Sequence, residues 1–321
     1  MGSIFKHSKM KNHKIHQGDT LYSEGQIEKA LNLYLDCLFE TEPDSELYMK
    51  IAHCNKLLLD SDNALEYYEK SLEKDSKNIE SMYNLAEIYL EKYNEDEATK
   101  HFKRILELSN PESSIAHLAQ EKIDTMRSTQ LNREGGELMS AGNYEEALDV
   151  FLEAIELNPK DKRNYLNIGV IFIKNGDLDK AKEWIHKAIE IAPDYIRAYF
   201  NLGTLYLKTS YYKIAQNIYK QAILIDPTSK DAADIDKNLK IAEDCLNKAL
   251  NDLLGYLKGQ QMLMNTSLTV ELLNQVCPEE INSYDVVYSE SGRIRIIAYS
   301  KKGIFECSIL QDKANIQKVN S

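Results

Sequence analysis

Two consecutive stretches of 34 residues decide the fold of this chain: 162-KRNYLNIGVIFIKNGDLDKAKEWIHKAIEIAPDY-195 and 196-IRAYFNLGTLYLKTSYYKIAQNIYKQAILIDPTS-229. When they are aligned, apolar, small and proline residues fall at the same eight places. The first stretch has them at Tyr165, Ile168, Gly169, Phe172, Ala181, Ile185, Ala188 and Pro193, and the second at Tyr199, Leu202, Gly203, Tyr206, Ala215, Tyr219, Ala222 and Pro227. A period of about 34 residues is typical of stacked supersecondary units, each of which buries its apolar face against its neighbours.

The same residue pattern continues toward the N-terminus in steps of 34 residues, with one interruption after residue 112. It predicts repeats over 11–44, 45–78 and 79–112, and a fourth over 128–161. The small, alanine and aromatic residues of these six copies resemble the pattern of the tetratricopeptide repeat family, whose unit is a helix–turn–helix. The resemblance implies a mostly α protein, a right-handed α-solenoid of six helix pairs.

Residue size at the repeated places follows from helix packing. A small residue on the first helix lets the second helix approach it closely, and these residues are Ala52, Ala86, Gly135, Gly169 and Gly203. A large aromatic residue on the second helix is expected to fill the space between consecutive pairs. These aromatic residues are Tyr34, Tyr68, Phe102, Phe151 and Tyr219.

Two segments depart from the phase. Residues 113–127 carry apolar residues at helical spacing, which predicts an extra helix or an extension of the helix that opens the fourth repeat. The repeats therefore fall into two blocks, 11–112 and 128–229. Residues 1–10 are polar and basic and are expected to form a flexible tail.

The repeat motif stops after Pro227. The apolar spacing over 230–262 predicts a helix that caps the last repeat, although the same spacing permits a coiled-coil seam and hence a dimer. Residues 263–321 predict a small α+β unit, with a short helix at 268–276 and a three-stranded antiparallel meander. The predicted strands are 284–289, 293–299 and 304–310.

Composition narrows the class of partner. The chain has 39 basic and 51 acidic residues and a net charge of −12, which disfavours nucleic acid and anionic membrane surfaces as partners.

The five cysteines of the chain are scattered without a CxxC pair, which favours a reducing compartment over a disulfide framework. No secretory signal and no apolar run of about 18 residues is present. The cytoplasm is the expected location.

Motifs for catalysis are missing from the sequence. There is no Gly-rich phosphate loop, HExxH or nucleophile elbow. The seven histidines are scattered along the chain. We therefore predict no catalytic residues, no metal site, no cofactor and no enzymatic activity.

The candidate partner-binding residues lie on the first helix of each pair, which in this family lines the concave groove. Asn84, Asn167 and Asn201 occupy one equivalent place. A carboxamide is both donor and acceptor, so it can pair with the backbone of an extended peptide, although asparagine here also has local structural roles. The fifth and sixth repeats add basic and apolar residues nearby: Arg163, Leu166, Val170, Lys174, Arg197, Phe200 and Lys208.

These side chains indicate the chemistry of the partner. Arg163 and Arg197 can each hold a carboxylate bidentately, and Leu166 and Phe200 can anchor apolar groups. We expect a bound segment that mixes acidic and hydrophobic residues. The second and third repeats present a more acidic face, which would suit a different partner.

The sequence thus predicts a scaffold or adaptor that binds an extended peptide or a partner protein in the groove. The alternative is a structural subunit of a larger or self-associating assembly, a homo-oligomer included, that uses the convex face, the capping helix or the edge of the C-terminal sheet. Some relatives clamp the acidic tails of heat-shock chaperones with five residues. The equivalent places here are Asn132, Gly136, Asn167, Arg197 and Asn201. Only Asn167 matches the clamp outright, and Arg197 keeps the charge of a clamp lysine. The sequence therefore disfavours that role.

Overall fold

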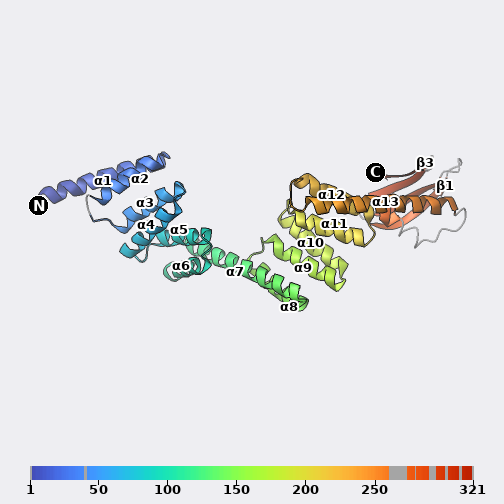
Figure 1. Ribbon diagram of the computed structural model, residues 1–321, viewed down its shortest axis with the longest axis horizontal. Coiled ribbons are helices and arrows are strands. Elements are labelled where there is room, and N and C mark those ends of the chain that lie inside the picture. The colour runs from blue at the N-terminus through green and yellow to red at the C-terminus, as the bar shows by residue number, and fades with distance from the viewer. Residues whose placement is uncertain are drawn as a thin grey trace. The chain divides into compact units, whose positions relative to one another are not determined.

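The computed structural model describes residues 2–39, 42–259, 273–278, 280–288, 294–300, 303–310 and 313–319. Helices occupy the described chain up to Gly259, and a β-sheet follows at the C-terminal end (Figure 1). The chain divides into two compact units, Met1–Thr129 and Gln130–Ser321, called unit 1 and unit 2 below. The boundary falls within the helix Ser114–Ala141, so this helix contributes to both units.

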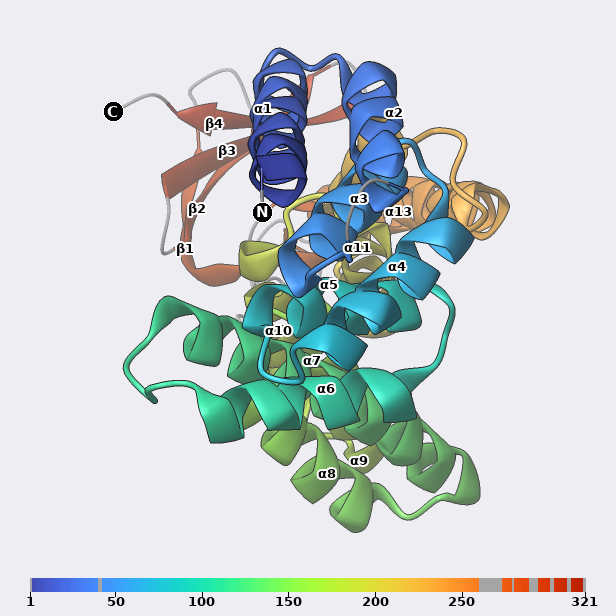
Figure 2. The same cartoon turned by 90° about the vertical axis from the view of Figure 1, so that its left-hand side faces the viewer.

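Unit 1 is built from three antiparallel helix pairs and the start of a seventh helix. Its helices are α1 (Gly2–Ser23), α2 (Ile27–Leu38), α3 (Ser45–Leu57), α4 (Ser61–Lys74), α5 (Ile79–Glu91), α6 (Glu95–Leu108) and α7 (Ser114–Ala141). Members of a pair pack side by side, as Figure 2 shows for α1 and α2. Residues 2–10 are helical and belong to α1, whereas the flexibility expected for residues 1–10 stays a prediction.

Unit 2 continues with the same kind of pair. After the end of α7 its helices are α8 (Tyr144–Leu157), α9 (Lys162–Asn175), α10 (Leu178–Ile191), α11 (Ile196–Lys208), α12 (Tyr212–Ile225) and α13 (Ala232–Gly259). Because α7 is continuous, residues 113–127 extend the helix that opens the fourth repeat and form no separate helix. No glycine or proline interrupts the chain between Ser114 and Gln130, so nothing local ends the helix there.

Polar side chains at the helix starts explain why the helices begin where they do. Asp44 accepts a hydrogen bond from the backbone N–H of Leu47, and Asn78 accepts one from Ser81. Asp177 caps α10 in the same way. Each cap satisfies a backbone donor that a helix leaves unpaired in its first turn.

All six pairs make the same turn between their two helices. One residue in each turn has a positive φ, between 58° and 86°: Gly25, Leu59, Tyr93, Gly142, Gly176 and Ser210. The N–H of this residue and the next N–H bond back to carbonyls of the first helix, as in Gly176 to Ile173 (3.3 Å) and Asp177 to Phe172 (3.0 Å). This backbone pattern is the Schellman motif, which suits glycine because a Cβ atom opposes positive φ.

The core follows the repeated residues. The five aromatic residues of the second helices are at most 1% exposed. A Cβ atom on Gly203 would lie 2.6 Å from Cε1 of Tyr219, so glycine is what allows α11 and α12 to come this close. Tyr219 also belongs to one cluster with Ile235 and Ala242 of the next helix, so the aromatic packs within its own pair as well as between consecutive pairs.

The long helix α13 covers the last repeat. Its side chains Ile235, Ala242, Leu246 and Ala249 are buried, and the first two pack against α11 and α12. This is the position in which a solenoid needs a cap, since the last pair would otherwise expose its apolar face.

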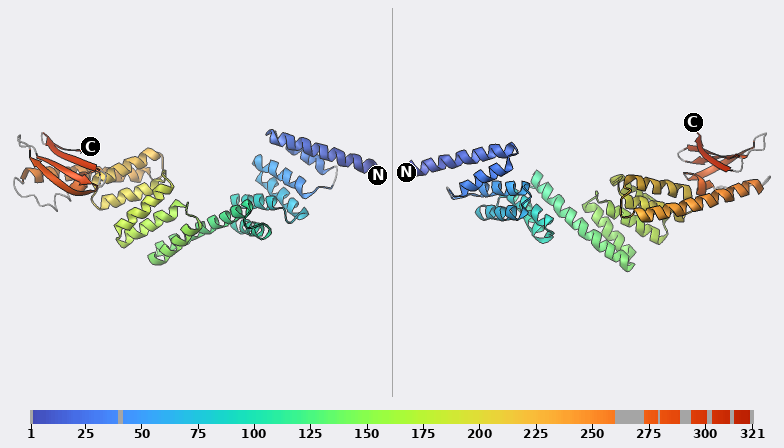
Figure 3. Two further views of the ribbon diagram at one scale, coloured as in Figure 1. Left: turned by 180° about the vertical axis from the view of Figure 1, so that it is seen from behind. Right: turned by 45° about the horizontal axis from the view of Figure 1, so that its top comes forward.

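The C-terminal sheet has four strands, so the prediction of a three-stranded meander is wrong. The strands are β1 (Ile281–Tyr288), β2 (Ile294–Ser300), β3 (Gly303–Leu310) and β4 (Lys313–Val319), antiparallel in the order β1-β2-β3-β4. β4 was missed because KANIQKV is mostly polar and only Ala314 and Ile316 alternate in the manner of a strand. β4 contacts α13 (Figure 3). Of the predicted helix at 268–276, residues 273–276 are helical and the rest lies outside the described residues.

Candidate partner-binding surfaces

The first helices of unit 2 bring six of the predicted residues onto one surface. Residues three, four or seven apart share one side of a helix, so Asn167, Val170 and Lys174 share a side of α9. Arg197, Asn201 and Lys208 share a side of α11 in the same way, and Asn201 and Lys208 lie one repeat after Asn167 and Lys174. Helix α11 contacts α9. We call the surface formed by these six residues the α9–α11 face.

The two asparagines of this face differ in the hydrogen bonds that their side chains make within the protein. Asn201 Nδ2 donates a hydrogen bond to the carbonyl of Arg197 at 2.8 Å, one turn earlier on α11. Asn167 is half-buried, and within the described part of the chain its carboxamide has no hydrogen-bond partner. The Asn167 side chain therefore keeps both its donor and its acceptor for a bound molecule.

The arginines are partly neutralised by acidic neighbours. Arg163 Nε lies 2.9 Å from Oδ1 of Asp161, and its Nη2 lies 2.7 Å from Oδ2 of the same carboxylate. Arg197 Nε is 3.4 Å from Oδ2 of Asp231. Asp161 is also the N-cap of α9. A carboxylate from a partner would have to displace Asp161 before Arg163 could hold it bidentately.

The two predicted apolar anchors are placed differently. Leu166 is 5% exposed and belongs to a core cluster with Leu202 and Leu205, so it cannot anchor a partner as predicted. It is buried because α10 and α11 both contribute side chains to the cluster around it. Phe200, its equivalent on α11, is half-buried, with its ring centroid 6.4 Å from that of Tyr219. Lys174 and Lys208 are exposed.

Asn84, the third predicted asparagine, lies in unit 1 and is already hydrogen-bonded. Its Oδ1 accepts from Lys56 Nζ at 2.9 Å, and its Nδ2 donates to the carbonyl of Glu80 at 2.9 Å. Lys56 comes from the preceding repeat. Asn84 thus joins two repeats, and a ligand would have to compete with Lys56 for its oxygen.

A set of ion pairs along the first helices of unit 1 was not predicted. Lys50 Nζ lies 2.6 Å from Oδ1 of Asp19, which links α3 to α1. Glu87 receives Lys56 at 2.8 Å and Lys122 at 3.1 Å, which links α5 to both α3 and α7. The sequence pattern that could have indicated these ion pairs is a pair of opposite charges 31 or 35 positions apart, which is close to the length of one repeat.

These ion pairs change the acidity of the carboxyl groups. Burial alone would raise the pKa of Glu87, but hydrogen bonds from Lys56 and Lys122 outweigh it and hold the pKa below its ordinary value. Asp19 behaves alike, because hydrogen bonds from Lys50 and Tyr34 overcome the effect of burial and lower its pKa. Both carboxylates are therefore charged at neutral pH, so Asp19 binds Lys50 and Glu87 binds Lys56 and Lys122.

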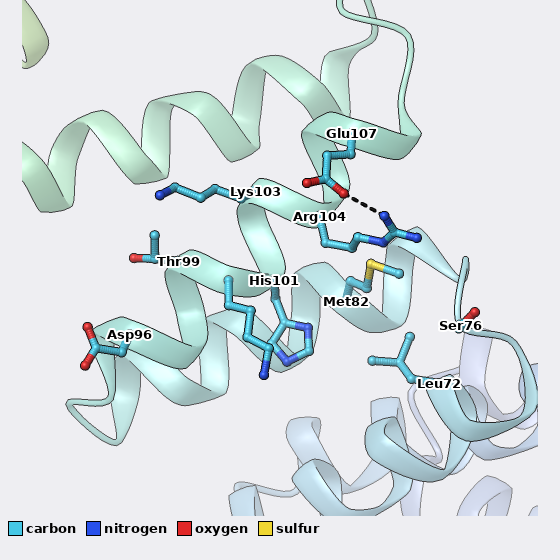
Figure 4. Close-up of a pocket in the computed structure, with 10 residues that line it drawn as sticks. Leu72, Ser76, Met82, Asp96, Thr99, His101, Lys103, Arg104 and Glu107 are labelled. Atoms are coloured by element: carbon cyan, nitrogen blue, oxygen red, sulfur yellow. Dashed lines mark hydrogen bonds and ion pairs between the residues drawn. The ribbon is translucent and has the colours of Figure 1, made fainter.

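A cavity of about 620 Å³ lies in unit 1 between the end of α4, α5 and α6 (Figure 4). Leu72 and Met82 form its apolar part, and His101 and Arg104 stand beside them. Arg104 Nη1 lies 2.6 Å from Oε2 of Glu107. Burial lowers the pKa of His101, so the imidazole is neutral at pH 7, and its ring stacks on Tyr89. The cavity thus has an apolar part at Leu72 and Met82 and a polar lining in which Arg104 is paired with Glu107.

No group of three or more His, Cys, Asp or Glu side chains that could hold a metal ion occurs among the residues that the structure describes. Over those same residues, no helix is both long enough and apolar enough to cross a membrane.

Stacked helix pairs with successive first helices on one surface define the class of helical-repeat proteins. Within that class, the chain belongs to the tetratricopeptide repeat family. Family models described as tetratricopeptide repeats match residues 60–123, 138–206 and 196–229.

Known proteins with similar repeats include a TPR repeat-containing protein of Methanocaldococcus jannaschii. It is 22% identical over 182 residues, which are 48% of this chain and 31% of that protein, so the match spans less than a third of the relative's length. Among solved structures, the TPR domain of P58(IPK) is 17% identical with a TM-score of 0.41, over 83% of this chain and 72% of that one. The TPR2AB domain of yeast Sti1, solved as a pHSP90 complex, is 18% identical with a TM-score of 0.35, over 74% and 99%.

Proposed function

We propose that this protein is a non-enzymatic scaffold that binds an extended segment of a partner protein across the α9–α11 face. The observation that carries the proposal is the pair Asn167 and Asn201. They lie one repeat apart on neighbouring first helices, and the carboxamide of Asn167 is not used by the described protein.

The spacing suits an extended chain. Packed helices lie about 8–10 Å apart, and an extended chain rises about 3.3 Å per residue. Asn167 and Asn201 could therefore pair with backbone groups of the same peptide about three residues apart. Backbone pairing is indifferent to the side chains of the peptide, so specificity must come from elsewhere on the face.

The flanking residues supply that specificity. Lys174 and Lys208 are exposed at equivalent places, and Val170 and Phe200 are half-buried on the same two helices. A segment with acidic residues among apolar ones fits this arrangement, because lysines attract carboxylates and exclude basic sequences. The lysines serve this role better than Arg163, whose guanidinium is held by Asp161.

The test compares affinity purification with the full chain and with the double variant Asn167→Ala/Asn201→Ala. The matched control is Asn217→Ala, which removes an exposed asparagine from α12, outside the face. We expect the double variant to lose the partner and the control to keep it. The recovered partner is then titrated against Lys174→Glu/Lys208→Glu, which should bind at least tenfold more weakly. Equal recovery by a folded double variant would refute the proposal.

The alternative role, a structural subunit, draws on the sheet. β1 is an edge strand, and among the described strands only β2 pairs with it. An open edge can accept a strand from another chain. Mass in solution at several concentrations separates the two roles, because a monomer that captures partners favours the scaffold and concentration-dependent oligomers favour the assembly.

A further inference from the structure

Large apolar side chains are exposed at two neighbouring turns of unit 1. Leu59, in the turn between α3 and α4, is 90% exposed, and Tyr93, in the turn between α5 and α6, is 94% exposed. Leu57 and Leu58 precede Leu59 and are 55% and 38% exposed. We call these four residues the turn patch.

The fold does not explain why Leu59 and Tyr93 are large. Both have positive φ, 62° and 58°, at the place that glycine occupies in three of the other four turns. Positive φ brings the Cβ of an L-residue close to its own backbone, so Leu and Tyr are less favourable here than Gly. The hydrogen bonds of the two turns come from the backbone, such as Leu59 N–H to Lys56 (3.1 Å) and Tyr93 N–H to Leu90 (3.0 Å), and from the helix caps Asp60 and Asn94. These side chains therefore neither shape the turn nor fill the core.

The two turns lie next to each other. Lys92, which precedes Tyr93, places its Nζ 2.5 Å from Oδ1 of Asp62, which follows the Leu59 turn. This ion pair joins the turns, so the four apolar residues belong to one surface and are not isolated exposures. Contiguous exposed apolar surface is typical of interaction sites.

The rim of the patch is acidic. Four exposed carboxylates stand at the two turns or in the first turns of α4 and α6: Asp62, Glu91, Glu95 and Asp96. Lys92 is exposed in the same segments and pairs with Asp62, so these two charges offset each other and the rim keeps a net negative charge. A surface of this kind favours a partner with positive charge around an apolar centre.

We propose that the turn patch is a docking surface for a short amphipathic segment of another protein, with leucine- or phenylalanine-like residues flanked by lysine or arginine. Charge argues against a second copy of this chain as the occupant. A two-fold contact would bring each acidic rim against its equal, in a chain whose net charge is already −12. The patch is separate from the α9–α11 face, and the proposal stands without it.

The test uses a fluorescent synthetic peptide of leucine and lysine at helical spacing, with a leucine–glutamate peptide as its counterpart. Fluorescence anisotropy is measured with the full chain and with Leu59→Gly/Tyr93→Gly. Glycine suits both turns, so the double variant should melt at the same or a higher temperature, and any loss of binding is not unfolding. The matched control is Phe39→Ser, which removes a side chain that is 90% exposed in the same unit, outside the patch.

We expect the double variant to bind the lysine peptide at least tenfold more weakly, the control to bind as the wild type does, and the glutamate peptide not to bind. Equal binding by wild type and double variant, or an equal loss in Phe39→Ser, would overturn the proposal. So would a wild-type dimer that the double variant abolishes, because a second copy would then cover the patch. A fall in the melting temperature of the glycine variant would show that the side chains stabilise the fold and would remove the premise.

Discussion

At the scale of single residues, Tyr34 and Tyr68 hold the same place in consecutive repeats but differ in their hydroxyl groups. Both side chains are buried. Tyr34 donates to Oδ1 of Asp19 at 2.7 Å, whereas the Tyr68 hydroxyl has no hydrogen-bond partner in the described chain. A buried hydroxyl without a partner loses its hydration and gains nothing in return. The aromatic ring is thus what the repeat requires at this place.

The two tyrosines should therefore respond oppositely to the loss of the hydroxyl. Tyr34→Phe is expected to lower the free energy of unfolding by about 1–2 kcal/mol, because Asp19 loses a donor, whereas Tyr68→Phe should be neutral or stabilise by up to about 1 kcal/mol. Urea unfolding followed by circular dichroism measures both. If Tyr68→Phe costs as much as Tyr34→Phe, the Tyr68 hydroxyl has a partner that this account lacks.

Adjacent glycines in α7 provide a second contrast. A Cβ on Gly135 would lie 2.7 Å from the ring of Phe151, whereas a Cβ on Gly136 would meet nothing within 4 Å. Gly135→Ala should destabilise by about 1–3 kcal/mol through overpacking. Gly136→Ala should stabilise by about 0.5–1 kcal/mol, because alanine loses less backbone entropy in a helix. Thermal and urea unfolding measure the change in the free energy of unfolding for each variant. A change of the same sign in both variants would contradict the packing described for Gly135 and Gly136.

At the scale of helices and strands, the repeat period predicts what packs, because each packing place needs one size of residue in every copy. It does not predict what binds. The sequence predicts Leu166 as an apolar anchor, but α10 and α11 bury it. For Asn84 the sequence leaves open a peptide contact and a local structural role. Its oxygen accepts from Lys56, 28 positions away, and no single repeat contains that contact. The fourth strand, Lys313–Val319, was missed because it lacks the alternation of a half-buried strand.

Two half-buried histidines should make unit 1 sensitive to mild acid. Burial lowers the pKa of His53 on α3 and of His101 on α6. The unfolded chain protonates histidine near pH 6.5, above the folded pKa, so it binds more protons in this window. Stability is then full above about pH 6.5 and falls as the pH drops from there toward the folded pKa. Hydrogen exchange at pH 7.5 and 5.5, corrected for intrinsic rates, should show α3 and α6 losing protection while α10 and α12 keep theirs.

The control for this prediction is the double variant His53→Gln/His101→Gln, in which the difference between the two pH values should shrink. A loss of protection spread equally over α10 and α12 would mean that histidine burial in unit 1 is not the cause.

At the scale of the whole chain, stacked pairs depend on their neighbours, so the ends of the array need protection. In unit 2 this protection comes from α13, whose Ile235 and Ala242 cover Tyr219 and Ala215 of α12. Behind α13, β4 contacts the helix, and Lys182 of α10 pairs with Glu280 at 3.1 Å, just before β1. The helix and the sheet thus have different roles: α13 completes the repeat core, and the sheet is attached to a core that is already closed.

Two truncations separate these roles. A chain that ends at Gly259 keeps α13, so hydrogen exchange should find α11 and α12 almost as protected as in the full chain. A chain that ends at Lys230 exposes the apolar side of α12, so α11 and α12 should lose protection and the helical signal should fall by more than α13 itself contributes. If the shorter chain protects α11 and α12 as well as the longer one does, α13 is not a cap, and its exposed seam would point instead to the self-associating assembly. If the longer chain already loses that protection, the sheet and not the helix completes the core.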